Sequence, residues 1–200
     1  MSTFAAGWSL CGGWAVDAWL GRQTREHGDL DITVFHNDQP ALFAHLAGWN
    51  LIAHDPNVVG DTTEPWDGRR LDLPAHIHAR PGDGQNLEVL NAWVRSPAAQ
   101  PRDGLNIEFI LNERSGRDWI LSSDPRLTLP VRRSARRSAW GVPTVVPEVV
   151  LFYKAGDSRP RDEADFRALL PHLGEAERHW LRAAIVLAFP GHRWLKELAA

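Results

Sequence analysis

The spacing of apolar and polar residues changes along the chain, from short apolar runs near the start to helical repeats near the end. Residues 8–11 and 30–35 form two short apolar runs, the second rich in β-branched side chains, so both are predicted to be strands. Between them, residues 14–20 fit two turns of helix that end at Gly21. The first 35 residues therefore predict a strand–helix–strand unit.

Short apolar runs separated by polar turns continue as far as residue 121, which is typical of strands. One helix interrupts them, predicted from Asp38 or Gln39 to about Gly48. Residues 55–70 are rich in Asp, Gly, Pro and Thr, and are therefore predicted to form an exposed loop. The other predicted strands are residues 50–54, 75–80, 86–91, 106–111 and 117–121.

Beyond residue 146 the apolar positions recur at helical spacing. Trp180, Leu181, Ala184 and Ile185, for example, follow a repeat close to 3.6 residues. Helices are predicted from Pro147 or Glu148 to about residue 156, and over residues 161–170 and 175–189.

The change of spacing divides the chain into three parts and predicts an α/β (α+β) protein. These parts are an α/β domain of residues 1–125, a connector of residues 126–146 rich in Pro, Arg and Ser, and a C-terminal helical region of residues 147–200.

Composition narrows the class of protein further. The 200 residues carry a formal net charge of −3, and no apolar run approaches the roughly 20 residues that span a bilayer, so no membrane association is expected. The single cysteine, Cys11, excludes an internal disulfide framework, and a cytoplasmic location is expected. The basic pairs Arg132–Arg133 and Arg136–Arg137 could contact RNA, but a solvated connector is favoured, because no aromatic residues alternate with them.

The residues with the clearest chemistry lie between positions 12 and 31. Asp29 and Asp31 are two apart at the start of a strand, so their carboxylates share a face and suit a hard cation such as Mg²⁺ bridging to a phosphate. Gly12 and Gly13 begin the first helix and let a phosphate approach bare backbone N–H groups. This segment predicts the binding of a nucleoside triphosphate.

The loop before the two acids carries further donors, Arg22, Arg25 and His27. Such a loop can hold the β- and γ-phosphates. Alternatively, Arg22 or Arg25 pairs with Asp17 or Glu26 to fix the loop, and His27 is interpreted as an orienting hydrogen-bond partner.

Two other sets of residues have simpler interpretations. His76 and His78 share a strand face and could bind a transition metal, but no third ligand stands at convincing spacing. Asp162 and Asp165 are interpreted as acids that stabilise a helix N-terminus and its docking.

Two motifs in the first 31 residues carry a family likeness: Gly12-Gly13-Trp14-Ala15, and then Leu20-Gly21-Arg22-x-Thr24-Arg25-x-His27-x-Asp29-x-Asp31. Together they resemble the nucleotidyltransferases of the aminoglycoside 2''-adenylyltransferase and lincosamide nucleotidyltransferase group, within the polymerase-β-like superfamily. Residues 75–81, 105–118, 147–155 and 159–166 look like bacterial members of the same group. The resemblance implies a small mixed sheet flanked by helices, with a C-terminal helical region closing one side of the cleft.

The resemblance also implies an activity: transfer of a nucleoside monophosphate, AMP first of all, from ATP with Mg²⁺ to a hydroxyl of an aminoglycoside-like or lincosamide-like small molecule. It implies a third carboxylate from a neighbouring strand, which completes the metal site or takes the hydroxyl proton. Glu108 is the first choice, with Glu88 and Asp72 as alternatives. Lys154 matches a helical lysine of the group that reaches the triphosphate, the alternative being a solvated lysine.

Two other functions remain open from the sequence. In the first, the same chemistry acts on a tRNA end or a protein, as in toxin-like relatives. In the second, the protein is a degenerate homologue that only binds nucleotide.

Overall fold

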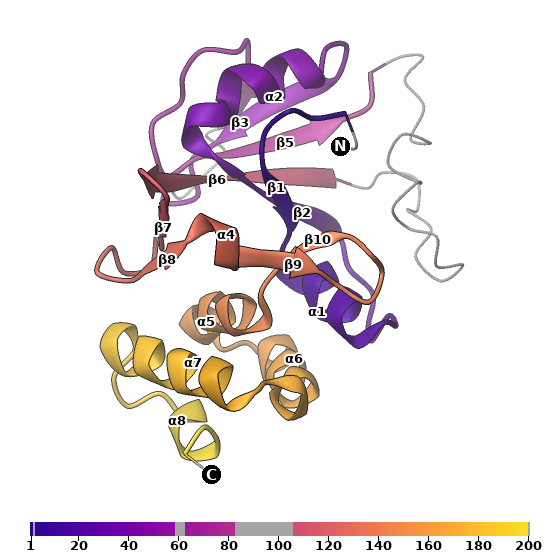
Figure 1. Ribbon diagram of the computed structural model, residues 1–200. Helices are drawn as coiled ribbons and strands as arrows, with labels where there is room; N and C mark the ends of the chain where they lie inside the picture. The colour runs from indigo at the N-terminus through magenta and orange to yellow at the C-terminus, as the bar shows by residue number, and fades with distance from the viewer. Residues whose placement is uncertain (2, 59–62, 83–105, 200) are drawn as a thin grey trace.

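The computed structural model describes residues 1, 3–58, 63–82 and 106–199 and contains one mixed β-sheet flanked by helices (Figure 1). Its strands are β1 (Trp8–Leu10), β2 (Asp29–Phe35), β3 (Asn50–His54), β4 (Glu64–Pro65), β5 (His76–Arg80), β6 (Asn106–Ser115), β7 (Asp118–Ile120), β8 (Thr128–Pro130), β9 (Ala135–Arg137) and β10 (Pro143–Val145). Its α-helices are α1 (Gly12–Leu20), α2 (Gln39–His45), α4 (Val131–Ser134), α5 (Pro147–Asp157), α6 (Pro160–Leu169), α7 (Glu175–Ala188) and α8 (Trp194–Glu197), and short 3₁₀ turns span His36–Asp38 and Leu170–His172.

The sheet has the strand order β4-β3-β5-β6-β2-β1-β10-β9. The strand β7 pairs antiparallel with the last residues of β6, and β8 pairs antiparallel with β7. The central strand β2 pairs in parallel with β6 and antiparallel with β1. Ile32 and Val34 are buried on one face of β2, and Thr33 is buried on the other. Because both faces of β2 are covered, its register is firmly set, and so is the position of the acids at its start.

Most of the elements predicted from residues 8–54 and 75–121 are confirmed. The helix α1 ends at Gly21, which adopts a left-handed conformation with φ 70°. The predicted strand at residues 86–91 lies outside the described residues. The helix α2 ends at His45, before the predicted end, because Leu46 leaves the helical conformation and Gly48 has a positive φ of 84°.

The described residues of the predicted exposed loop at residues 55–70, namely 55–58 and 63–70, are only partly exposed. The short strand β4 pairs with β3, and Trp66 next to it is buried with its indole N–H donating to the carbonyl of Arg69 at 2.7 Å. A large aromatic side chain in a polar segment therefore marks a point where this segment returns to the sheet.

The segment of residues 126–146, expected to be a connector, supplies β8, α4, β9 and β10. The strand β10 pairs in parallel with β1, and β9 pairs antiparallel with β10 at the edge of the sheet. Thr144 and Val145 are buried there. Strands of three residues are too short to show an alternating pattern, which explains why the sequence did not reveal them.

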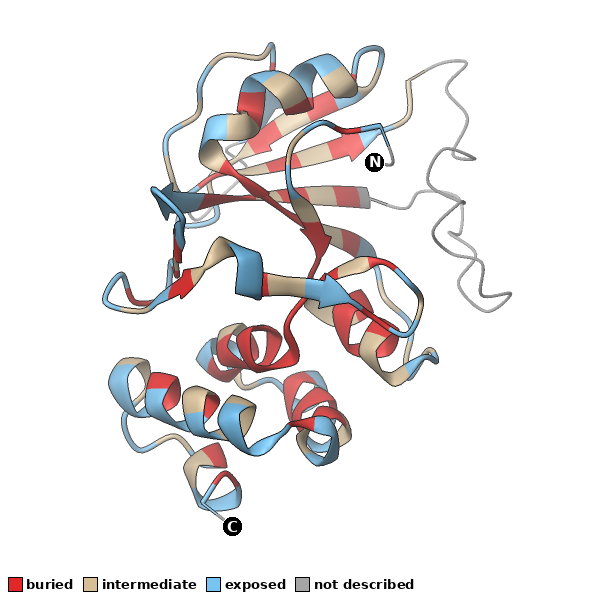
Figure 2. Ribbon diagram, in the orientation of Figure 1, coloured by how far each residue is buried: buried red, intermediate tan, exposed pale blue. Residues whose placement is uncertain are grey.

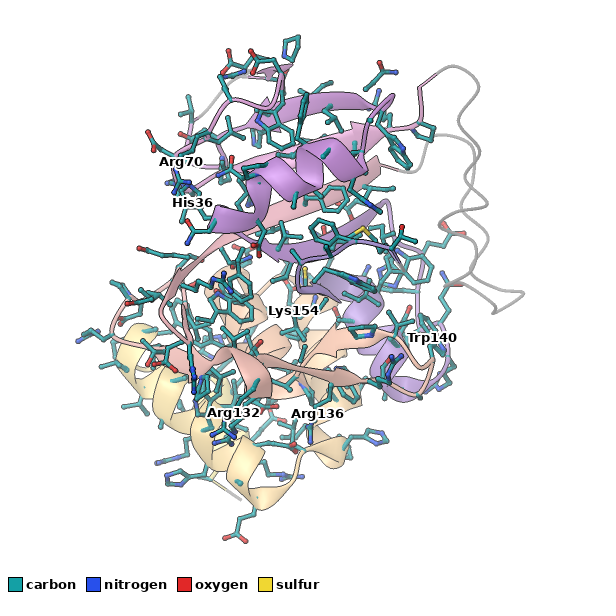
Figure 3. The ribbon with its side chains drawn as sticks, turned by 45° about the horizontal axis from the view of Figure 1, so that its top comes forward. His36, Arg70, Arg132, Arg136, Trp140 and Lys154 are labelled. Carbon is teal, nitrogen blue, oxygen red and sulfur yellow. The ribbon has the colours of Figure 1, made fainter. Side chains whose placement is uncertain are left out.

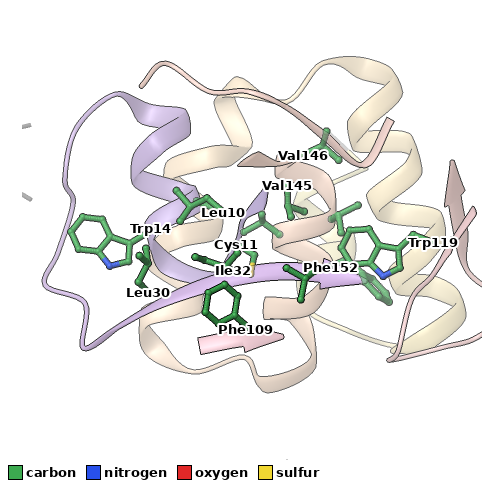
Figure 4. Packing of buried hydrophobic residues seen from close by; sticks show 14 of the residues in the cluster. Leu10, Cys11, Trp14, Leu30, Ile32, Phe109, Trp119, Val145, Val146 and Phe152 are labelled. Carbon is green, nitrogen blue, oxygen red and sulfur yellow. The ribbon is translucent and has the colours of Figure 1, made fainter. Parts of the chain in front are cut away.

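The C-terminal helices share the hydrophobic core of the sheet. Figure 4 shows side chains from β1, β2, β6, β10 and α5 meeting in one cluster, among them Leu10, Ile32, Phe109, Val145 and Phe152. The helix α5 is buried along most of its length, whereas α7 exposes its outer face (Figure 2). The described chain contains no helix with the length and apolar character needed to span a membrane. The helix α5 therefore joins the sheet to the other C-terminal helices.

Candidate active site

Three carboxylates meet where β2 and β6 run side by side. The parallel register places Asp31 beside Glu108, and Asp29 stands two residues before Asp31 on the same strand face. One carboxylate oxygen of each residue lies within 4.8 Å of the other two. In the described part of the chain, these acids are the one group of three Asp, Glu, His or Cys side chains with such spacing. The geometry is that of a site for a divalent cation bound by oxygen ligands.

The charges of these acids influence one another. Burial raises the pKa of Asp31 from 3.8 to about 7, and the negative charges of Asp29 and Glu108 add to this effect, while the ammonium group of Lys154 opposes it. Burial also disfavours ionisation of Glu108, but the hydrogen bond and positive charge of His76 outweigh it and lower the pKa of Glu108. The cluster thus holds more negative charge than its protein neighbours balance.

His76 orients Glu108. The two residues lie on the paired strands β5 and β6, and His76 Nδ1 is 2.5 Å from Glu108 Oε1. His78 also faces Glu108, with its Nε2 atom 3.9 Å from Oε1. The two histidines therefore share a strand face as predicted, and both face a carboxylate.

Gly12 and Gly13 lie in contact with the acids and with the loop before them. Gly12 has φ +63°, and a Cβ atom added there would overlap the carboxylate of Asp31. A Cβ atom on Gly13 would overlap the side chains of His27 and Arg25. The preceding residue, Cys11, is buried, and its backbone N–H donates to the carbonyl of Asp31 at 3.0 Å. The N-terminus of α1 is therefore held directly against the acid cluster.

The loop of residues 21–28 is fixed by Asp17, but through partners other than arginine. The carboxylate of Asp17, fully buried in α1, accepts hydrogen bonds from the backbone N–H and the hydroxyl of Thr24. His27 Nε2 lies 2.6 Å from its other oxygen, and the His27 ring packs against Trp14 with centroids 4.5 Å apart. His27 is thus an orienting partner, as predicted.

Of the two loop arginines, only Arg25 is brought to the site. The predicted pairing of an arginine with Asp17 is wrong, because Thr24 and His27 take both oxygens of that carboxylate. The side chain of Arg22 is exposed and makes no ion pair with the three acids among the described contacts. Arg25 instead forms an ion pair with Asp165, with its NH2 atom 3.2 Å from Oδ2.

Lys154 is buried, so the alternative of a solvated lysine is wrong. Its Nζ atom lies 2.6 Å from Asp165 Oδ2 and 3.2 Å from Asp162 Oδ1. Figure 3 shows Lys154 between the sheet and the C-terminal helices, whereas Arg132 and Arg136 lie near α7, where Arg136 pairs with Glu177. Lys154 and Arg25 thus form a cationic pair joined by Asp165.

The two alternative third acids stand apart from this site. Asp72 is exposed in the segment before β5 and does not belong to the carboxylate group. Glu88 lies outside the described residues. Asp162 accepts a hydrogen bond from the backbone N–H of Arg159 at the start of α6, which confirms its interpretation as a helix N-terminal acid.

Sequence reasoning named Asp17, His76 and Asp165 but missed the partners that the structure gives them. The buried contacts of Asp17 with Thr24 and His27 could have been found, because an acid inside a short apolar helix indicates a buried partner. The contact of His76 with Glu108 depends on strand register, and the contact of Asp165 with Arg25 joins residues 140 positions apart, so neither leaves a local pattern.

The fold is similar to those of solved antibiotic adenylyltransferases. The crystal structure of ANT(2'')-Ia in complex with adenylyl-2''-tobramycin matches with a TM-score of 0.52 at 16% identity, over 90% of this chain and 87% of that one. The solution structure of the antibiotic-resistance factor ANT(2'')-Ia matches with a TM-score of 0.52 at 18% identity, over 90% of this chain and 82% of that one. The crystal structure of lincomycin-bound LnuA, a lincosamide antibiotic adenylyltransferase, matches with a TM-score of 0.50 at 15% identity, over 82% of this chain and 85% of that one. At these identities the likeness shows the fold alone.

A comparison with curated proteins finds no match. The family described as aminoglycoside-2''-adenylyltransferase, however, matches residues 1–110, which is more than half of the chain and includes the glycine turn, the Asp-x-Asp strand and Glu108. The chain therefore belongs to the aminoglycoside-2''-adenylyltransferase family of nucleotidyltransferases.

Proposed function

We propose that the protein is a Mg²⁺-dependent adenylyltransferase that transfers AMP from ATP to a hydroxyl of an aminoglycoside-like or lincosamide-like small molecule. The single observation that carries the proposal is the contact between the carboxylate cluster and the first turn of α1 at Gly12. This contact brings a cation site and a phosphate-binding backbone together.

The residues present fit a divalent cation. Asp29, Asp31 and Glu108 supply closely spaced oxygen atoms, and burial together with the charges of Asp29 and Glu108 raises the pKa of Asp31, an effect that a bound cation would oppose. We assign the cation to these three carboxylates. When bound there, Mg²⁺ would neutralise triphosphate charge and favour in-line attack at the α-phosphorus.

The protein's own residues divide the remaining work. Gly12 and Gly13 lie at the first turn of α1 against the acid cluster and the loop before it, and we assign their backbone N–H groups to the phosphates. Arg25 lies over the first turn of α1, and the charge of Lys154 acts on Asp31, so both cations are assigned to the triphosphate. Arg22 is exposed, and no described contact of its side chain places it beside the first turn of α1 or the acids, so it is not assigned to the triphosphate.

Glu108 is assigned a second task on the acceptor side. Its Oε1 atom contacts His76, and one oxygen of the same carboxylate belongs to the cluster assigned to the cation. The same carboxylate can accept the hydroxyl proton as the new P–O bond forms and pyrophosphate leaves. His76 keeps this carboxylate in one orientation.

The proposal is tested with purified protein, labelled ATP, Mg²⁺ and a panel of aminoglycosides and lincosamides. We expect pyrophosphate release that needs both the metal and one class of acceptor, and loss of this release in Asp29→Asn. Full activity of the Asp29→Asn variant would contradict the assigned metal site. Glu163→Gln, which changes a buried acid paired with Arg193 and not with Arg25 or Lys154, is the matched control.

The same assay tests the other two functions. Label transferred to RNA or protein from a cell lysate, but to no small molecule, would favour the toxin-like acceptor. Binding of Mg²⁺–ATP without transfer to any acceptor would favour a degenerate homologue.

A further inference from the structure

A single buried carboxylate, that of Asp165 in α6, connects the two cations beside the acid cluster. Its Oδ2 atom lies 2.6 Å from Lys154 Nζ and 3.2 Å from Arg25 NH2, and Arg25 Nε donates to Oδ1 at 3.4 Å. The side chain of Asp165 is only 3% exposed. The contact with Lys154 is therefore buried on both sides, whereas the contact with Arg25 is partly buried, because the Arg25 side chain is 26% exposed.

The two cations come from different parts of the fold. Arg25 belongs to the loop after α1, and its guanidinium group crowds Gly13 at the first turn of that helix. Lys154 belongs to α5, and its charge lowers the pKa of Asp31. Arg25 thus lies at the first turn of α1, and Lys154 lies on a helix that packs against α1, close enough for its charge to act on Asp31.

The neighbouring acid cannot take over this role. Asp162 also contacts Lys154, but its second oxygen accepts hydrogen bonds from the backbone and the guanidinium group of Arg159, which stabilise the start of α6. Asp165 reaches the loop and α5 at once, whereas Asp162 is occupied within the C-terminal region.

Within the described part of the chain, the contacts of both cations leave some of their N–H donors unused. An ammonium group has three N–H bonds, and Lys154 directs two at Asp162 and Asp165. A guanidinium group has five, and Arg25 uses three on Asp165 and the carbonyl of Glu26. A carboxylate between two like charges also offsets their repulsion and limits the rotamers of two long side chains.

We propose that Asp165 is a positioning residue that holds Arg25 and Lys154 side by side to bind the β- and γ-phosphates of the nucleotide. This inference rests on the proposed function and deepens it. The residue that positions the phosphate-binding cations lies in α6, outside residues 1–110, which are the residues that the family matches. Asp165 is not one of the three clustered carboxylates, so its assigned role is to act through the two cations.

The test compares the binding of Mg²⁺–ATP and of AMP by calorimetry in the wild type and in Asp165→Asn. AMP lacks the two phosphates assigned to the cations, so a positioning role weakens ATP binding about tenfold and AMP binding less than twofold. In turnover, KM for ATP rises by a similar factor while kcat at saturating ATP changes little. Glu163→Gln, on the same helix and paired with Arg193, leaves both affinities unchanged.

Three results would overturn the proposal: unchanged ATP affinity in Asp165→Asn, tighter ATP binding, or an equal loss for ATP and AMP. If Asp165→Asn does not fold, Asp165→Glu replaces it, because it keeps the charge and moves the carboxylate by one methylene. We then expect an ATP-specific loss of about threefold, and wild-type affinity in that variant would overturn the proposal. A wild-type protein that binds no Mg²⁺–ATP would instead refute the proposed function.

Discussion

The two sides of the candidate site are built in different ways. The acid side is set by strand register, since Asp31 and Glu108 are neighbours in the parallel pair β2–β6. The cationic side is set by ion pairs between a loop, α5 and α6. A sheet holds its side chains in place even when one of them is replaced, whereas an ion-pair network loses its geometry with a single member. Substitutions on the two sides should therefore have different consequences.

The largest effect is expected on the acid side. Asp31→Asn removes a central oxygen ligand, so transferase activity should fall by about 10³-fold or more. Thermal stability without metal should stay the same or rise, because the substitution relieves repulsion among three carboxylates. Activity assays and thermal denaturation measure the two quantities, and a large loss of stability would show that register alone does not hold this side.

Gly12→Ala should break the contact between the N-terminus of α1 and the acid side. The added Cβ overlaps the Asp31 carboxylate, and the positive φ costs a further 1–2 kcal/mol or so. We expect activity to fall by about 100-fold and the free energy of unfolding to decrease, measured by kinetics and chemical denaturation. Gly116→Ala is the control, because Gly116 has a similar φ of 58° but open space around its Cβ position.

On the cationic side, Lys154→Gln should affect binding and stability together. KM for ATP should rise about tenfold, and the free energy of unfolding should fall by about 3 kcal/mol, because Asp162 and Asp165 lose a shared buried partner. Substrate titrations and denaturation curves test this. The exposed Lys196→Gln is the control, and an effect on kcat alone would contradict the contrast between the two sides.

The smallest change is expected in the pH dependence of the metal-free protein. The pKa of Asp31 is raised to about 7, so between about pH 4 and pH 7 the folded state holds a proton that the unfolded state has released. Stability from this residue is thus lost as the pH rises through that range. The melting temperature of the wild type relative to Asp31→Asn should fall by a few degrees, and Mg²⁺ should restore it. If the difference in melting temperature between the wild type and Asp31→Asn does not change with pH, the titration of Asp31 does not affect stability and this prediction is wrong.

The sequence predicted those parts of the molecule that depend on neighbouring residues. Period-two spacing placed Asp29 and Asp31 on one face, and the helix of residues 14–20 ended at Gly21 as predicted. The short strands β9 and β10 gave no such signal, because three residues cannot show a period. The pair formed by Arg25 and Asp165 is a product of tertiary packing, so it was visible only once α6 was placed beside the loop.

The burial of Cys11 has a practical consequence. Burial and the nearby charge of Asp31 raise the pKa of this thiol, and it is the one cysteine in the chain. Because Cys11 is buried and its backbone N–H donates to Asp31, we expect an alkylating reagent to reach the thiol when the start of α1 moves away from β2. The rate of alkylation should therefore report this local opening, and a nucleotide bound as proposed should slow it.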